Sequence, residues 1–132
     1  MRIESRIGHV RRTPQTIYAA LSDFNRLSTN MLPQDKISNL QVTEDSCSFD
    51  INNAGHFGMR VIDREPFKTV KIAATEDSSI KFTMWIQMKE FQETDSAVKV
   101  TLDAELNMLL GAVAKGPLTK FVNSIVDNLE RI

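Results

Sequence analysis

Residues 80–89 read IKFTMWIQMK, and this stretch decides the fold class because every second residue is apolar. Apolar and polar side chains that alternate with a period of two are typical of a β-strand with one face on a core. Residues 98–106 alternate in the same way. The two runs predict strands whose inward side chains are Ile80, Phe82, Met84, Ile86, Met88, Val98, Val100, Leu102, Ala104 and Leu106.

Shorter alternating runs precede these strands, at residues 37–42, 47–51, 57–62 and 70–72. Turn signals separate them. Asn and Gly in residues 52–55 tolerate the positive φ of tight turns, and Pro66 ends a run because proline cannot donate to a sheet ladder. Short runs divided by such turns predict an antiparallel meander.

The N-terminal segment predicts one more strand and two short helices. Residues 2–12 alternate, with Ile3, Ser5 and Ile7 expected on one face. Thr13-Pro14 supplies a hydroxyl N-cap and a proline at the first helical position. Residues 22–25 then lead into a second helix, which Pro33 must end.

The chain closes with a broad apolar stripe at helical spacing, with Asn107 as its N-cap. Only a sheet face can cover so wide a stripe. Gly116-Pro117 interrupts it, and we expect a kink or a break into two helices there. A bend at this point could gate access to the space beneath the helix, or Pro117 could merely begin a second helix as a static corner.

This order of elements resembles the START-related, polyketide-cyclase-like superfamily (SRPBCC), over the whole chain. The local features that carry the resemblance are Ile3-Glu4-Ser5-Arg6-Ile7, then Thr13-Pro14 leading to Ile17-Tyr18 and Leu21-Ser22-Asp23, and finally residues 117–122, PLTKFV. The resemblance implies an α+β helix-grip fold: a curved antiparallel sheet of about six to seven strands, two short helices after the first strand, and a long C-terminal helix. It also implies an apolar cavity and little more, because functions vary widely on one fold.

The leading functional hypothesis is binding or carriage of a small apolar molecule, lipid-like or polyketide-like, between the sheet and the C-terminal helix. The residues expected to line that space are Phe57, Met59, Phe82, Met84, Leu102, Leu110, Val113 and Phe121. One alternative is a cyclase or dehydratase, which needs a titratable inward side chain. Only His9 and Tyr18 are polar-tipped candidates for that role. A second alternative is a protein-interaction module resembling the chaperone-activating relatives.

Composition bounds these hypotheses. A chain of 132 residues predicts one domain, residues 1–132, and a formal charge of −1 gives no basic block for nucleic acid. The charged start of the chain is unlike a signal peptide, and no apolar run reaches the roughly 20 residues of a membrane span. We therefore expect a cytoplasmic protein that does not insert into membranes.

No catalytic, metal or cofactor site is predicted. His9 and His56 lie on different strands without a third ligand, and Asp103 and Glu105 fit a solvated outer face. Cys47 alternates with Phe49 and Ile51, so we expect it to be buried and unreactive. Trp85 lies on the outer face, where it either packs against a helix or forms a partner interface such as a homodimer.

Overall fold

An antiparallel sheet of eight strands forms the main layer of the structure, a computed structural model that describes residues 1–132. Its strand order is β1-β8-β7-β6-β5-β4-β3, and β2 also pairs with β8. The strands are β1 (Arg2–Glu4), β2 (Gly8–Val10), β3 (Ile37–Val42), β4 (Cys47–Ile51), β5 (Gly55–Glu65), β6 (Thr69–Ala74), β7 (Phe82–Gln92) and β8 (Asp95–Ala104).

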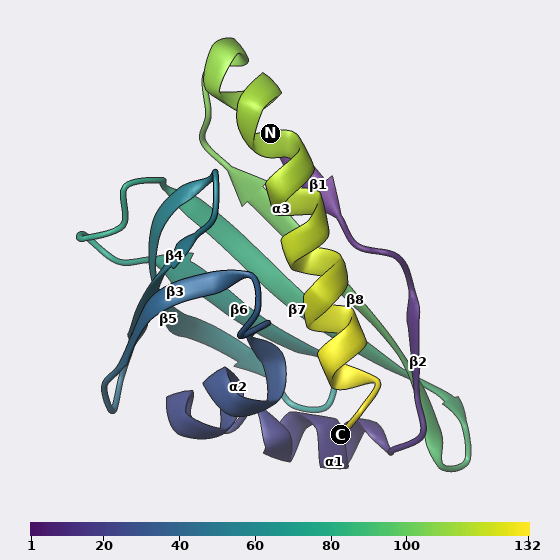
Figure 1. Ribbon diagram of the computed structural model, residues 1–132. Helices are drawn as coiled ribbons and strands as arrows, with labels where there is room; N and C mark the ends of the chain where they lie inside the picture. Colours follow the sequence, from purple (N-terminus) through teal and green to yellow (C-terminus); the bar gives the residue numbers. More distant parts are fainter.

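Three helices complete the fold: α1 (Pro14–Ala20), α2 (Phe24–Met31) and α3 (Met108–Leu129). The sheet curves, α3 crosses in front of it, and α1 and α2 lie near the C-terminal end of α3 (Figure 1). This arrangement confirms the α+β helix-grip architecture. The expected break at Gly116-Pro117 is absent, because α3 runs as one helix with Pro117 inside it.

The predicted helix starts are confirmed. The Thr13 hydroxyl accepts from the Thr16 amide at 3.2 Å, and the Asp23 carboxylate accepts from the Arg26 amide at 2.8 Å. The Asn107 side-chain oxygen accepts from the Leu110 amide at 2.8 Å. Each cap satisfies an amide that has no partner within its own helix, which fixes where the helix begins.

The opening strand differs from the prediction because it is split into β1 and β2. The Ser5 amide donates to the Val100 carbonyl, and the Ser5 hydroxyl accepts from the Val100 amide, each at 2.8 Å. The Arg6 amide then donates to the Asn123 side chain of α3 at 2.8 Å. This detour ends the alternation, so Ile7 is 71% exposed rather than inward. The split also raises the strand count to eight.

The core fills the space between the sheet and the helices. A cluster of 31 buried apolar residues contains the inward side chains of β4 to β8 and one side of α3. Turn chemistry behaves as predicted, since Asn53 and Gly55 have φ values of 65° and 114°. No helix is both long enough and apolar enough to cross a membrane.

Candidate ligand-binding site

Six of the eight residues predicted to line the space come together in the core. β5, β7, β8 and α3 each contribute to this set, and all its side chains are buried. The strand members share one face because inward positions recur every second residue. The six residues are Phe57, Met59, Phe82, Met84, Leu102 and Phe121.

Phenylalanine rings form a layer beneath α3. The ring centroids of Phe49 and Phe121 lie 5.7 Å apart, and those of Phe57 and Phe82 lie 5.1 Å apart. Phe57 also lies 6.5 Å from Phe121. These distances are within the range of favourable aromatic pairs. The layer therefore couples α3 to the β4–β5 side of the sheet through side chains.

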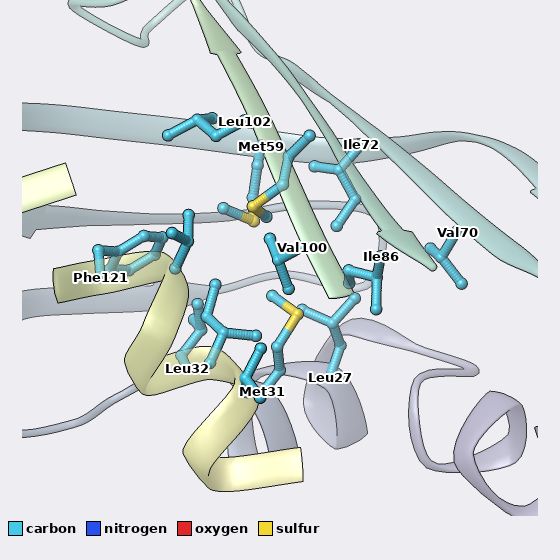
Figure 2. Close-up of a cluster of buried hydrophobic side chains, with 14 of the residues drawn as sticks. Leu27, Met31, Leu32, Met59, Val70, Ile72, Ile86, Val100, Leu102 and Phe121 are labelled. Carbon is cyan, nitrogen blue, oxygen red and sulfur yellow. The ribbon is translucent and has the colours of Figure 1, made fainter. Parts of the chain in front are cut away.

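Methionine side chains fill the space beside this layer. Met31 of α2 and Met59 of β5 lie among Leu27, Ile86 and Val100 in the core (Figure 2). Met59 and Met84 are completely buried. Thioether side chains are unbranched and flexible, so they can change shape at low cost. The interior is filled, but part of its filling is adaptable.

Leu110 and Val113 do not join the buried set, which corrects their predicted inward orientation. They are 54% and 64% exposed, and Met108 and Leu109 beside them are exposed as well. The first turns of α3 extend past the end of β8 (Figure 1), so the sheet does not cover them. The helical stripe in the sequence continues beyond the surface that buries it.

A hollow of about 300 Å³ lies at the rim between α3 and the β4–β5 turn. On the helix side it is lined by Gly116, Pro117 and Lys120, and on the sheet side by Lys36 and Ile51 among others. Ile51 is buried and continues into the core cluster. This hollow is therefore a place where the surface meets the apolar interior.

The interior offers almost no acid or base. Among the 40 buried residues Cys47 is the only one with a titratable side chain. Burial raises the pKa of its thiol to about 12, so the thiol is neutral near pH 7. Its predicted burial is confirmed, with 2% of the residue exposed.

Neither of the two polar-tipped candidates is buried in the core. His9 is exposed, and its Nε2 is 3.0 Å from a carboxylate oxygen of Asp95. Tyr18 is half-buried against Phe67, with ring centroids 5.5 Å apart, and the Arg64 guanidinium lies 5.9 Å from the Tyr18 ring centre. Neither side chain forms an acid–base pair that faces the core.

A titratable cluster that sequence reasoning missed lies on the outer face. His56 Nδ1 is 2.7 Å from Asp50, and His56 Nε2 is 3.6 Å from Asp77. The Asp50 contact raises the pKa of His56, and hydrogen bonds from Asn39 and His56 lower the pKa of Asp50. Asp77 belongs to the β6–β7 loop, and the alternation of residues along strands does not predict where a loop lies. No group of three or more His, Cys, Asp or Glu side chains is arranged to hold a metal ion.

The β6–β7 loop is held against β5 at Gly58. The Thr75 amide donates to the Gly58 carbonyl at 3.0 Å, and the Ser79 amide donates to the His56 carbonyl at 3.0 Å. A Cβ at position 58 would collide with the Thr75 hydroxyl and the Asp77 carboxylate. Gly58 therefore lets the loop lie on the outer face.

Trp85 lies on the outer face as predicted. It is half-buried, and the Lys71 ammonium lies 5.7 Å above its ring. This cation–π contact covers part of the ring. A homodimer through this face stays a prediction.

Comparison with known proteins gives fold-level matches alone. No family model matches the chain, and no curated protein matches it in sequence. The KanY protein, solved by NMR, superposes with a TM-score of 0.77 at 15% identity, over 99% of this chain and 95% of that one. The XoxI protein of Bacillus cereus gives a TM-score of 0.70 at 13% identity, over 98% and 93% of the two chains.

A START superfamily protein of Mycobacterium smegmatis also matches. Its TM-score is 0.63 at 14% identity, over 97% of this chain and 98% of that one. Similarity at these identities establishes the fold and leaves the function open.

Proposed function

From the START-like, SRPBCC-type helix-grip fold of this chain, we propose that the protein binds or carries a small apolar molecule between the curved sheet and α3. One observation carries the proposal: the surface that α3 and the sheet turn toward each other consists of apolar side chains. The cluster mixes large rings with flexible thioethers. Such a lining favours a ligand recognised mainly by its shape and apolar area.

The chemistry of the interior selects against polar ligands. No buried side-chain nitrogen or oxygen lacks a hydrogen-bond partner, so none is left free to bind a polar group. Burying an amide or hydroxyl without a partner costs roughly 2–7 kcal/mol. Burying apolar surface instead contributes about 25 cal/mol per Å². The interior therefore favours hydrocarbon over any hydrogen-bonding group.

Room for a ligand comes from side-chain rearrangement. α3 packs closely on β8, β1, β2 and α2, whereas it meets β4 and β5 across the phenylalanine layer. A ligand on that side needs to displace rings and thioethers while the backbone contacts of α3 to β8 stay in place. Methionine adapts to this more readily than branched side chains.

The apolar character of the interior also favours carriage over catalysis. A cyclase or dehydratase needs an acid or base that reaches its substrate. Cys47 is the one buried titratable group, and its high pKa keeps it protonated. Binding requires no such group.

Two measurements test the proposal. Native mass spectrometry of freshly purified protein should reveal a bound small molecule. Protein stripped of that molecule should bind the neutral fluorophore N-phenyl-1-naphthylamine with saturable enhancement. The double substitution Met59→Leu/Met84→Leu keeps volume nearly constant but removes flexible thioethers, so it should weaken probe binding.

Met108→Leu is the matched control, because Met108 is exposed at the start of α3. It should bind the probe as wild type does. Absence of any bound molecule together with absence of saturable probe binding would exclude the proposed function.

A further inference from the structure

The hollow between α3 and the β4–β5 turn has a mostly polar and charged lining, with Ile51 as its aliphatic side chain. Lys120 projects from α3 at this rim, and Lys36 lies across from it just before β3. Ile51, at the end of β4, is 3% exposed. The hollow thus joins two cations to the buried core.

Asp35 also lines the hollow, so Lys36, Lys120 and Asp35 together leave one net positive charge at this rim. Lys120 has no carboxylate within ion-pair distance, and α3 carries no acidic side chain before Asp127. Lys36 pairs with its neighbour Asp35 at 3.7 Å, but the Asp35 side chain is 78% exposed. Exposed ion pairs of this kind are weak, so both ammonium groups remain available to an incoming anion.

Ile51 belongs to the same buried cluster as the phenylalanine layer, although no phenylalanine lines the hollow. Phe121 follows Lys120 directly on α3, and Phe49 precedes Ile51 by two residues on the inward face of β4. Their rings lie 5.7 Å apart. A molecule that entered past Ile51 would meet apolar surface at once, while its outer end stayed beside the two lysines.

We propose that the ligand is an amphiphile with an anionic head group, held by Lys36 and Lys120 at the rim, and with an apolar body that enters between Ile51 and Phe121. This inference rests on the proposed function and adds the class of ligand and the site of its polar end. The rim lysines supply charge attraction, and the core supplies apolar burial. A neutral molecule of the same length gains only the second contribution.

The test compares dodecanoate with dodecanol as competitors for bound N-phenyl-1-naphthylamine at low salt. Dodecanoate should displace the probe about tenfold more effectively, the gain expected from two partly exposed ion pairs. Lys36→Gln/Lys120→Gln should abolish this preference and leave neutral probe binding unchanged. Lys115→Gln is the matched control, because Lys115 is exposed on α3 and lies outside the hollow. It should keep the preference.

The outcomes separate the two proposals. Equal displacement by dodecanoate and dodecanol, or an undiminished preference in Lys36→Gln/Lys120→Gln, would overturn the head-group site while leaving apolar binding standing. Failure of the neutral probe to bind wild-type protein would overturn the proposed function and this inference together.

Discussion

The two faces of β4 and β5 differ completely although their residues are immediate neighbours. Phe49 and Phe57 are buried in the core, whereas Asp50 and His56, one position away on each strand, form an ion pair on the outer face. In the register of these strands Phe49 lies opposite Phe57 and Asp50 lies opposite His56, so each cross-strand pair lies on one face. The inner face holds the apolar side chains that the core of the fold requires. The outer face holds the chemistry that responds to pH.

Removing the C-terminal part of α3, which covers the inner face of the sheet, should have the largest effect on stability. A chain that ends at Pro117 lacks six buried side chains of α3 that face the sheet: Leu118, Phe121, Val122, Ile125, Val126 and Leu129. We expect it not to fold, because burial of this surface is the main favourable term for a domain of this size. Circular dichroism and thermal melting measure the result. Strand-rich spectra with a sharp transition would refute the dependence on α3.

Substitution of neighbours on β5 compares the faces directly. Phe57→Ala should destabilise the fold by about 3–5 kcal/mol, the usual cost of removing a buried ring. His56→Ala should lie within about 1 kcal/mol of wild type, as most surface substitutions do. Urea unfolding of both variants gives the two free energies. Similar values for the two would mean that the faces do not differ as the structure indicates.

The rate at which the Cys47 thiol reacts tests whether the inner face of β4 is buried. Its thiol is buried and neutral, and only a thiolate reacts rapidly with disulfide reagents. Labelling of native protein by dithionitrobenzoate should be about a hundredfold slower than labelling in denaturant, since it requires local opening. Rapid stoichiometric labelling without denaturant would place Cys47 outside the core.

Gly116 and Pro117 lie where the outer surface meets the inner space. Gly116 has open space around it, so alanine fits there, and Pro117 interrupts the helical hydrogen bonding of α3. Gly116→Ala/Pro117→Ala should therefore stabilise the protein by about 1 kcal/mol or more. If this segment acts as a gate, the variant should also take up N-phenyl-1-naphthylamine more slowly in stopped-flow fluorescence.

Lys115→Ala provides the control for that experiment, as a substitution on the same turn that leaves the glycine and proline in place. Uptake by Gly116→Ala/Pro117→Ala at the wild-type rate would show that the segment is a static part of the helix.

The outer face should produce the smallest effect, a modest pH dependence. The folded-state pKa of His56 is raised by Asp50, so its contribution to stability is fully present below the unfolded pKa of about 6.5. It is lost as the pH rises through the raised folded value. The free energy of unfolding should therefore fall slightly with rising pH in wild type and fall less in His56→Gln. Identical pH profiles would remove His56 as the cause.

The sequence predicted the architecture well because local and long-range signals agree there. Alternation on β7 and β8, the caps at Thr13 and Asn107, and the helix that follows residues 22–25 were predicted from local sequence signals, and the structure confirms them. The predicted orientation of Ile7 was wrong because the Arg6 side chain turns toward Asp127 of α3 and Glu130 just after it. Alternation in the sequence does not reveal such a contact.

The site was predictable only in part. Inward positions on strands follow from alternation, but the exposed orientation of Leu110 and Val113 depends on where β8 ends relative to α3. The lysines at the hollow were missed for a similar reason. Lys36 and Lys120 are 84 residues apart in sequence, and only the packing of α3 on the sheet brings them to one rim.

Gly58 has a consequence for how this chain tolerates sequence change. It occupies an outward position of β5, where alternation alone would permit almost any polar residue. The Thr75 hydroxyl and the Asp77 carboxylate of the loop lie where a Cβ would be, so both side chains would have to move. In a saturation-mutagenesis scan, position 58 should therefore accept as few substitutions as its buried neighbours Phe57 and Met59. Functional homologues that carry a larger residue there should have a β6–β7 loop of different length.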